Sequence, residues 1–301
     1  MSFGNRLINT GGGGVQGIPF SAGSISSSVY VSEFGNYSNE GSGPTVMSND
    51  GLFAYKFAVG FSQGFSYQLG TPYDGLFNNN NPKYSTFYWE SAYGDWRPNH
   101  GYWNEAQTVL TSIAYSGNSS AGNYIASQNA VITSGGYYNI SNRYAIGQTD
   151  PNLGGIGNFA GISFAGSGFR ALAVGYDSKW NLYDVPTPYE LKTPEGAWTK
   201  LQTGSIPNGA NANKCWMSDD GTNVFFIDQS WMIRQYLLST PYDMSTMGSL
   251  YGSFDATSTL NPNHSVQSIV IPAIGNNFYI ESYYQVAPYP NPRYLMKKYT
   301  L

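Results

Sequence analysis

Cysteine is nearly absent from this sequence, and charged residues are scarce. The one cysteine, Cys215, excludes an intrachain disulfide, and its apolar neighbours Trp216 and Met217 favour a buried, inert thiol over a nucleophile. Charged residues are only 11% of the chain, and its 14 Lys and Arg residues are scattered. Because a phosphate backbone is bound by clustered basic residues, nucleic acid is not expected as a partner.

Long apolar runs and helical periodicity are also missing. No stretch approaches the roughly 20 apolar residues of a membrane-spanning helix, so no membrane span is expected. Residues 1–14 lack the apolar core of a signal peptide. The abundant residues are Tyr (26), Phe (16), Trp (7) and Gly (36), which are typical of short strands and tight turns. The composition therefore predicts an all-β fold.

An internal repeat organises the chain. Its clearest copy runs from the turn Met217–Gly221 through two apolar strands to the segment Thr240–Asp243. The same plan, with nearly the same spacing, recurs over residues 47–74 and 168–190. Three copies with matching residues at both ends are not expected by chance, so the repeat indicates one structural unit used several times.

Two degenerate copies, at 113–126 and 269–299, bring the count to five units of about 55 residues each. Each unit is typical of a small antiparallel meander, in which an Asp-Gly pair supplies positive φ at a hairpin and the Thr-Pro segment turns into an outer strand. Radial stacking buries both faces of such sheets. The sequence therefore predicts a β-propeller of about five blades, with a plain β-sandwich as the alternative.

The two ends of the chain predict how this ring closes. The last unit stops where the other units turn into their outer strand. Near the N-terminus, Ser28–Phe34 is similar to Gly248–Phe254, which is an outer strand of the repeat. We therefore expect the N-terminal strand to complete the last blade, so that residues 25–301 form the propeller.

Residues 1–24 fall outside the repeat and are rich in glycine. A segment of this kind is too flexible for a packed core. It is either a disordered tail or a docking arm that orders on a larger assembly, and we favour the arm. Its candidate assembly residues are Arg6, Gly11, Gly12, Gly13 and Gly14.

The unit Ser218–Thr246 resembles repeats of bacteriophage proteins that are taken to be propeller-like, although Asp219 stands where their pattern has Pro. The opening Asn5–Gly14 is similar to the start of some phage virion proteins. The resemblance implies a virion component, such as a tail or head appendage present in multiple copies, and it brings no catalytic residues. It also reconciles a surface composition typical of extracellular recognition with the missing signal peptide, because virions assemble in the cytoplasm and leave on lysis.

Residues for chemistry are few. His100 and His264 lie far apart in Pro- and Asn-rich segments, which favours solvated loop histidines over a metal site. The carboxylates Asp50, Asp74, Glu190, Asp220 and Asp243 recur at equivalent places in the units. Recurrence indicates turn formation, because a catalytic pair of a glycosidase is placed only once. We expect no enzyme activity, no cofactor and no metal.

The segment Tyr84–Glu105 is the main departure from the repeat and reads as a loop-like insertion. It is either a small aromatic core or a platform for a sugar ring or a protein. Its candidate binding residues are Tyr88, Trp89, Trp96, His100, Tyr102 and Trp103. The leading hypothesis is a virion surface protein whose partners are other virion proteins and a host-surface glycan or protein. A lectin-like propeller and a polysaccharide hydrolase are the alternatives.

Overall fold

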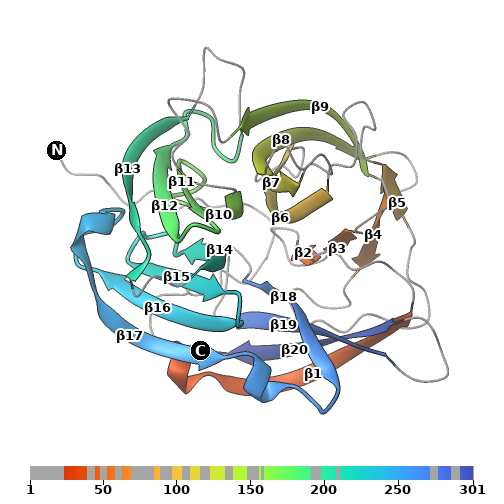
Figure 1. The fold of residues 1–301 in the computed structure, drawn as a ribbon. Helices are drawn as coiled ribbons and strands as arrows, with labels where there is room; N and C mark the ends of the chain where they lie inside the picture. The colour runs from red at the N-terminus through yellow and green to blue at the C-terminus, as the bar shows by residue number, and fades with distance from the viewer. Residues whose placement is uncertain are drawn as a thin grey trace, which may run out of the picture.

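The computed structural model describes residues 24–38, 45–47, 53–57, 63–68, 85–88, 97–103, 109–115, 123–132, 138–147, 156, 159–190, 198–207, 211–271, 277–285 and 292–300. Within these residues the strands form five antiparallel sheets of four strands each. The sheets are arranged in a ring (Figure 1), and the first strands of neighbouring sheets meet around its axis. The chain is a five-bladed β-propeller, as the repeat predicts.

The blades follow the chain from the axis outward. Blade 1 contains β2 (Thr45–Met47), β3 (Phe53–Phe57), β4 (Gln63–Gln68) and β5 (Ser85–Tyr88), and blade 2 contains β6 (Arg97–Trp103), β7 (Val109–Tyr115), β8 (Asn123–Ile132) and β9 (Tyr138–Gly147). Blade 3 contains β10 (Phe159–Ala165), β11 (Arg170–Gly175), β12 (Lys179–Asp184) and β13 (Thr199–Ser205). Blade 4 contains β14 (Ala212–Met217), β15 (Asn223–Asp228), β16 (Met232–Leu238) and β17 (Met247–Asp255). Blade 5 contains β18 (His264–Val270), β19 (Asn277–Gln285), β20 (Pro292–Thr300) and β1 (Val29–Ser38).

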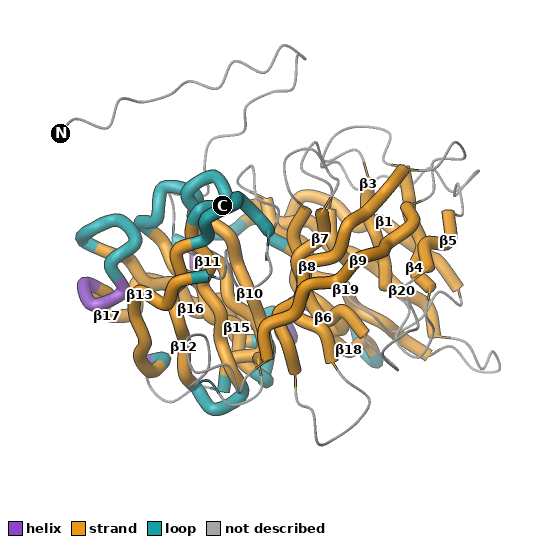
Figure 2. Tube along the Cα trace, turned by 90° about the horizontal axis from the view of Figure 1, so that it is seen from above, coloured by secondary structure: helices purple, strands orange, loops and turns teal. Residues whose placement is uncertain are grey.

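Three short 3₁₀ helices complete the described elements: η1 (Ile25–Ser27), η5 (Met244–Thr246) and η6 (Thr257–Thr259). The strands run between the two faces of the ring, and turns gather at both ends (Figure 2). No helix in the described part of the chain is long and apolar enough to cross a membrane.

The ring closes through the two ends of the chain, as predicted. β1 is the outer strand of blade 5 and pairs antiparallel with the C-terminal strand β20, with Tyr30 opposite Tyr299. Before β1, the buried Ile25 donates its backbone N–H to Gln235 Oε1 on blade 4, at 2.7 Å. Ser26 Oγ also contacts both the N–H and the C=O of Ser253 in β17. The N-terminal segment therefore fastens blade 5 to blade 4.

A glycine and a tyrosine explain why the two ends of the repeat occur together. Gly221, at φ 70°, ends the turn between β14 and β15, and the ring of Tyr242 lies directly over it. A Cβ on Gly221 would be 2.4 Å from that ring. In blade 3, Gly168 and Tyr189 repeat this contact, with a Cβ distance of 2.5 Å. The Thr-Pro-Tyr turn is thus packed on the hairpin of its own blade.

The prediction that the Asp-Gly pair supplies positive φ to the hairpin is confirmed for the glycine and wrong for the aspartate. Among the turn residues only Gly221 has positive φ, and Asp220 does not. Asp220 instead accepts hydrogen bonds from Ser218 Oγ and from Thr222. The loop is longer than two residues because the backbone N–H of Ser218 donates to Asn223 O at 2.9 Å, which leaves residues 219–222 between them, and inside this loop the N–H of Gly221 donates to Ser218 O at 2.8 Å.

Replacing Gly221 with Ala is expected to lower the free energy of unfolding by about 2–4 kcal/mol, because positive φ and the Tyr242 ring both penalise a Cβ. Gly248→Ala is the matched control. A Cβ on Gly248 would have its nearest neighbour, Leu237 O, at 3.7 Å, so little change is expected there. Chemical denaturation of both variants checks the prediction, and equal effects would contradict it.

Cys215 is buried in β14, as its neighbours predict. Its Sγ contacts Leu172 O of blade 3 at 3.2 Å, and burial raises the pKa of the thiol well above its usual range. The thiol is therefore part of the packing between blades 3 and 4 rather than a nucleophile.

Candidate functional site

The aromatic segment predicted as a binding loop is not an insertion. Tyr88 ends β5, the outer strand of blade 1, whereas His100, Tyr102 and Trp103 lie in β6, the inner strand of blade 2. The prediction of a loop-like insertion was wrong because the outer strand of blade 1 and the inner strand of blade 2 are poorly matched to the repeat. The binding role of these residues stays a prediction. Trp89 and Trp96 lie outside the described residues.

The arm residues Arg6, Gly11, Gly12, Gly13 and Gly14 also lie outside the described residues, so the docking arm stays a prediction. The expected loop placement is wrong for both histidines, because His100 lies in β6 and His264 in β18. His264 begins β18, and its Nδ1 is 3.1 Å from Ser282 Oγ. Its ring stacks on Tyr284 with the centroids 4.3 Å apart, which makes it part of blade 5.

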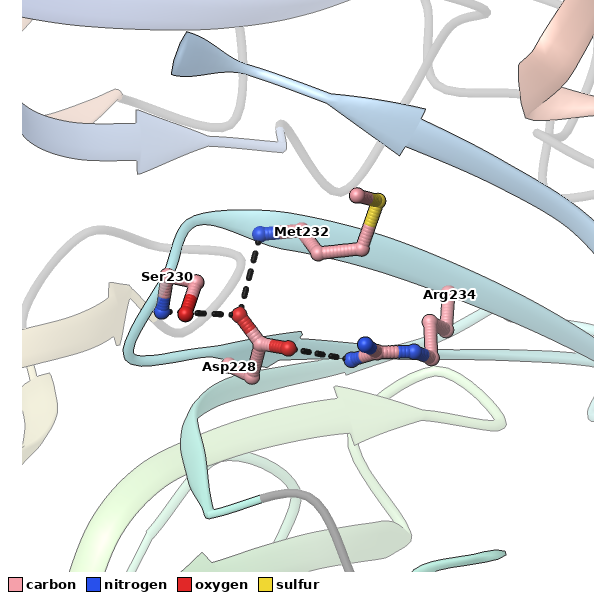
Figure 3. Close-up of polar contacts among 4 residues, drawn as sticks. All are labelled: Asp228, Ser230, Met232 and Arg234. Carbon is pink, nitrogen blue, oxygen red and sulfur yellow. Dashed lines mark hydrogen bonds and ion pairs between the residues drawn. The ribbon is translucent and has the colours of Figure 1, made fainter. Parts of the chain in front are cut away.

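Asp243, one of the recurring carboxylates, stabilises a turn of blade 4 as predicted, and Asp228, which is not one of them, also stabilises a turn of this blade. Asp243 caps η5, and hydrogen bonds from Ser245 and Gln202 lower the pKa of its carboxyl. In Figure 3, Asp228 accepts hydrogen bonds from the backbone N–H of Ser230 (2.8 Å) and Met232 (3.0 Å) and is paired with the Arg234 guanidinium. Each carboxylate thus accepts hydrogen bonds from the turn that it stabilises.

On the face formed by the first hairpins, blades 3 and 4 are joined by a polar contact. The C=O of Asp219 accepts the N–H of Gly166 at 2.9 Å and also the hydroxyl of Tyr242. The Arg170 guanidinium lies over the Tyr242 ring, 5.9 Å from its centroid. Burial, with Asp219 and Asp220 nearby, raises the pKa of Tyr242 to about 12. These groups hold two neighbouring hairpins together.

The outer strands of blades 3, 4 and 5 share a surface feature. Each has a one-residue bulge in its pairing with the preceding strand, and the extra residue is Leu201 in β13, Tyr251 in β17 and Val31 in β1. These three side chains are 47%, 49% and 48% exposed. We call them, with the exposed Tyr30 and Leu250 beside them, the rim residues.

The bulges have a repeated cause. The strand inside each bulge carries a buried tyrosine at the register shift, and these are Tyr183, Tyr236 and Tyr299. Opposite each tyrosine, two residues of the outer strand face one partner, and the extra side chain is left exposed. In blades 3, 4 and 5 a tyrosine of the third strand thus marks the bulge, whereas the register shift between β8 and β9 of blade 2 lies at Gln128 and Asn129.

A second polar feature lies near the axis. Lys214 of blade 4 donates to Ser268 Oγ of blade 5 at 2.7 Å, and Thr45 of blade 1 donates to Glu281 Oε2 of blade 5 at 3.1 Å. All four side chains are buried. We call them the axial clasp. In the described residues no group of three His, Cys, Asp or Glu is placed to hold a metal ion.

No family model and no curated protein sequence matches this chain. Among solved structures, the chain is similar to the β-propeller domain of Cps50 (Swd1) from Myceliophteria thermophila, with 12% identity, a TM-score of 0.45, and 82% of this chain and 84% of that chain covered. It is also similar to a luciferin-regenerating enzyme, with 9% identity, a TM-score of 0.49, and 91% and 95% covered. The propeller fold follows from the five sheets and their closure, independently of these likenesses.

Proposed function

We propose that this chain is a non-enzymatic surface protein of a bacteriophage particle, present in several copies as a tail or head appendage. It serves as a rigid propeller that docks to other virion proteins, and a host-surface glycan or protein is a further partner. The resemblance of the Ser218–Thr246 unit to phage repeats supports the virion origin. The rim residues support the docking role.

The observation that carries the docking role is the recurrence of exposed apolar side chains at equivalent bulges. Apolar residues scattered singly over a surface are normal, but Leu201, Tyr251 and Val31 occupy one repeated position on three successive blades. β17 carries no charged residue over Met247–Phe254, although exposed edge strands usually carry charges that prevent association. The uncharged apolar surface of β17 suits the buried centre of a protein interface.

The Asp228 and Asp243 carboxylates support a non-enzymatic role. A catalytic carboxylate must be free to reach a substrate, whereas these two are engaged by turn backbone and side chains of their own or the neighbouring blade. Their substitution is expected to weaken the fold rather than abolish a reaction.

Rim substitutions test the docking role. Changing both Val31 and Tyr251 to Ser is expected to reduce incorporation of the protein into particles at least tenfold and to leave the thermal midpoint within a few degrees, because both side chains are half exposed. Ser249→Ala, on the same exposed strand, is the control and is expected to incorporate normally. Quantification of the protein in purified particles gives the result, and normal incorporation of the double variant contradicts the role of the rim.

The virion origin has its own test, which is mass spectrometry of intact, purified particles. This chain is expected in several copies per particle. If the protein were present in the lysate but absent from the particles, that result would contradict the virion origin.

A further inference from the structure

The N-terminal segment lies directly against the outer strand of blade 4. A Cβ on Gly252 of β17 would lie 2.3 Å from Ser24 Oγ, so the missing side chain lets Ser24 approach the strand. Beside it, Ser26 Oγ accepts a hydrogen bond from the N–H of Ser253 at 2.9 Å and donates one to its C=O at 3.0 Å. One hydroxyl thus binds both backbone groups of Ser253, as a neighbouring strand would.

The order of these contacts gives the course of the segment. Ser26 contacts Ser253, and Ser24, two residues earlier, contacts Gly252. The segment therefore runs in the same sense as β17. A continuation of this course on the N-terminal side of Ser24 leads along residues 247–251 of the strand.

That part of β17 has an exposed edge without charges. Residues 247–251 include no charged residue, and Leu250 and Tyr251 are both about half exposed. Exposed edge strands usually carry charges, or are covered by a loop, and either device prevents association. β13 and β1, the other two outer strands with rim residues, carry Lys200 and Glu33. Of these three strands, β17 is the one that requires a cover.

Residues 18–23, which precede the first described residue, match this edge in length and in chemistry. At roughly 3.3 Å per residue the stretch 247–252 is about 17 Å long, and six extended residues have the same reach. The segment has no charged residue and contains Ile18, Pro19 and Phe20. Proline restrains the residue before it to an extended conformation and offers no N–H to a further strand. Because the segment is tethered beside the edge, its effective concentration there is in the millimolar range, and a weak contact is enough.

We propose that residues 18–23 lie along the edge of β17 of their own chain and cover Leu250 and Tyr251. The cover prevents this uncharged edge from pairing with a strand of another molecule. Since Tyr251 is also a rim residue, a docking partner displaces the cover when it binds. This last consequence alone rests on the proposed function.

The test is photochemical cross-linking of the free, purified protein with benzoylphenylalanine in place of Phe20. The cross-link is expected within residues 247–252 of the same chain, with a yield that does not depend on protein concentration. The same photoprobe in place of Ile8 is expected to give roughly tenfold less of this product, because it is further from the tether. Mass spectrometry of the digested monomer locates the cross-link. Cross-links that join two copies or lie outside β17 contradict the proposal, as do equal yields from the two positions.

A charge placed on the edge provides a second test. Tyr251→Lys is expected to lower the yield of the cross-link from position 20 roughly tenfold, because a lysine on an edge strand opposes pairing. Leu201→Lys is the matched control, since Leu201 occupies the equivalent bulge of β13 and is equally exposed, and its yield is expected to equal that of the parent. A yield that Tyr251→Lys leaves unchanged contradicts the contact with β17. Both tests use the free protein, so their results do not depend on the virion origin.

Discussion

Deletion of residues 1–38 is expected to abolish folding of the monomer. The deletion removes the buried Ile25 and all of β1, and it leaves the outer edge of β20 without a partner. The buried Met296 and Tyr299 then lose the strand opposite them. The loss is comparable with the whole stability of a typical domain, roughly 5–15 kcal/mol. Calorimetry is expected to show no cooperative transition, and chromatography to show aggregates.

Deletion of residues 1–23 is the matched control for this prediction. It keeps Ser24–Ser38, including the contacts of Ile25 with Gln235 and of Ser26 with Ser253. The thermal midpoint is expected to stay within a few degrees of the parent. A synthetic peptide of residues 24–38 is expected to restore a cooperative transition to the longer deletion, because strand addition to an open sheet edge supplies the lost pairing. A longer deletion that folds normally would contradict the closure.

The free energy of unfolding is expected to rise with pH through Lys214. Its pKa is lowered to about 8 in the folded protein from the ordinary value of 10.5, because burial disfavours the charged form. Between these two pH values the unfolded chain binds the proton more strongly than the folded chain, so stability increases as the pH rises. The contribution of this one group is about 2–3 kcal/mol between pH 7 and pH 10.

Lys214→Met isolates that contribution from the titration of Tyr236 and Tyr242, whose pKa values burial raises. The unfolding free energy of the parent minus that of the variant is expected to become more positive by about 2–3 kcal/mol between pH 7 and pH 10. Urea denaturation of the parent and the variant at both pH values measures the unfolding free energies. A difference that does not change with pH would mean that Lys214 is hydrated in the folded protein.

The sequence predicts the parts of this fold that depend on short, repeated patterns. The Asp-Gly and Thr-Pro-Tyr segments place the hairpin and outer turn of blade 4, and Gly168 with Thr187–Tyr189 places those of blade 3. The likeness of Ser28–Phe34 to Gly248–Phe254 predicts the closing strand. The inner strand of blade 2, β6, was harder to predict from the sequence because it contains Pro98 and has a register shift before His100. Those features hide the strand and led to the wrong prediction of a loop.

The axial clasp and the rim could not be predicted in the same way. Lys214 and Ser268 are joined across a blade boundary, and nothing local to either residue indicates the other. The rim residues depend on bulges, which are set by the pairing of two strands rather than by one strand alone. The positive φ of Tyr189 and Tyr242 is likewise unexpected for an aromatic residue, and it follows from packing of each ring on a glycine.

The closure of the ring is tested most directly by an engineered disulfide between β1 and β20. Ser32 and Lys298 are partners in the antiparallel pair, and such partners have Cα separations of about 4.5–5.5 Å, within the range of a disulfide. The variant Ser32→Cys with Lys298→Cys is expected to form an intramolecular disulfide in most monomers, while the out-of-register pair Ser32→Cys with Arg293→Cys stays reduced. Equal cross-linking of the two pairs, or none in either, would contradict a ring closed by its two ends.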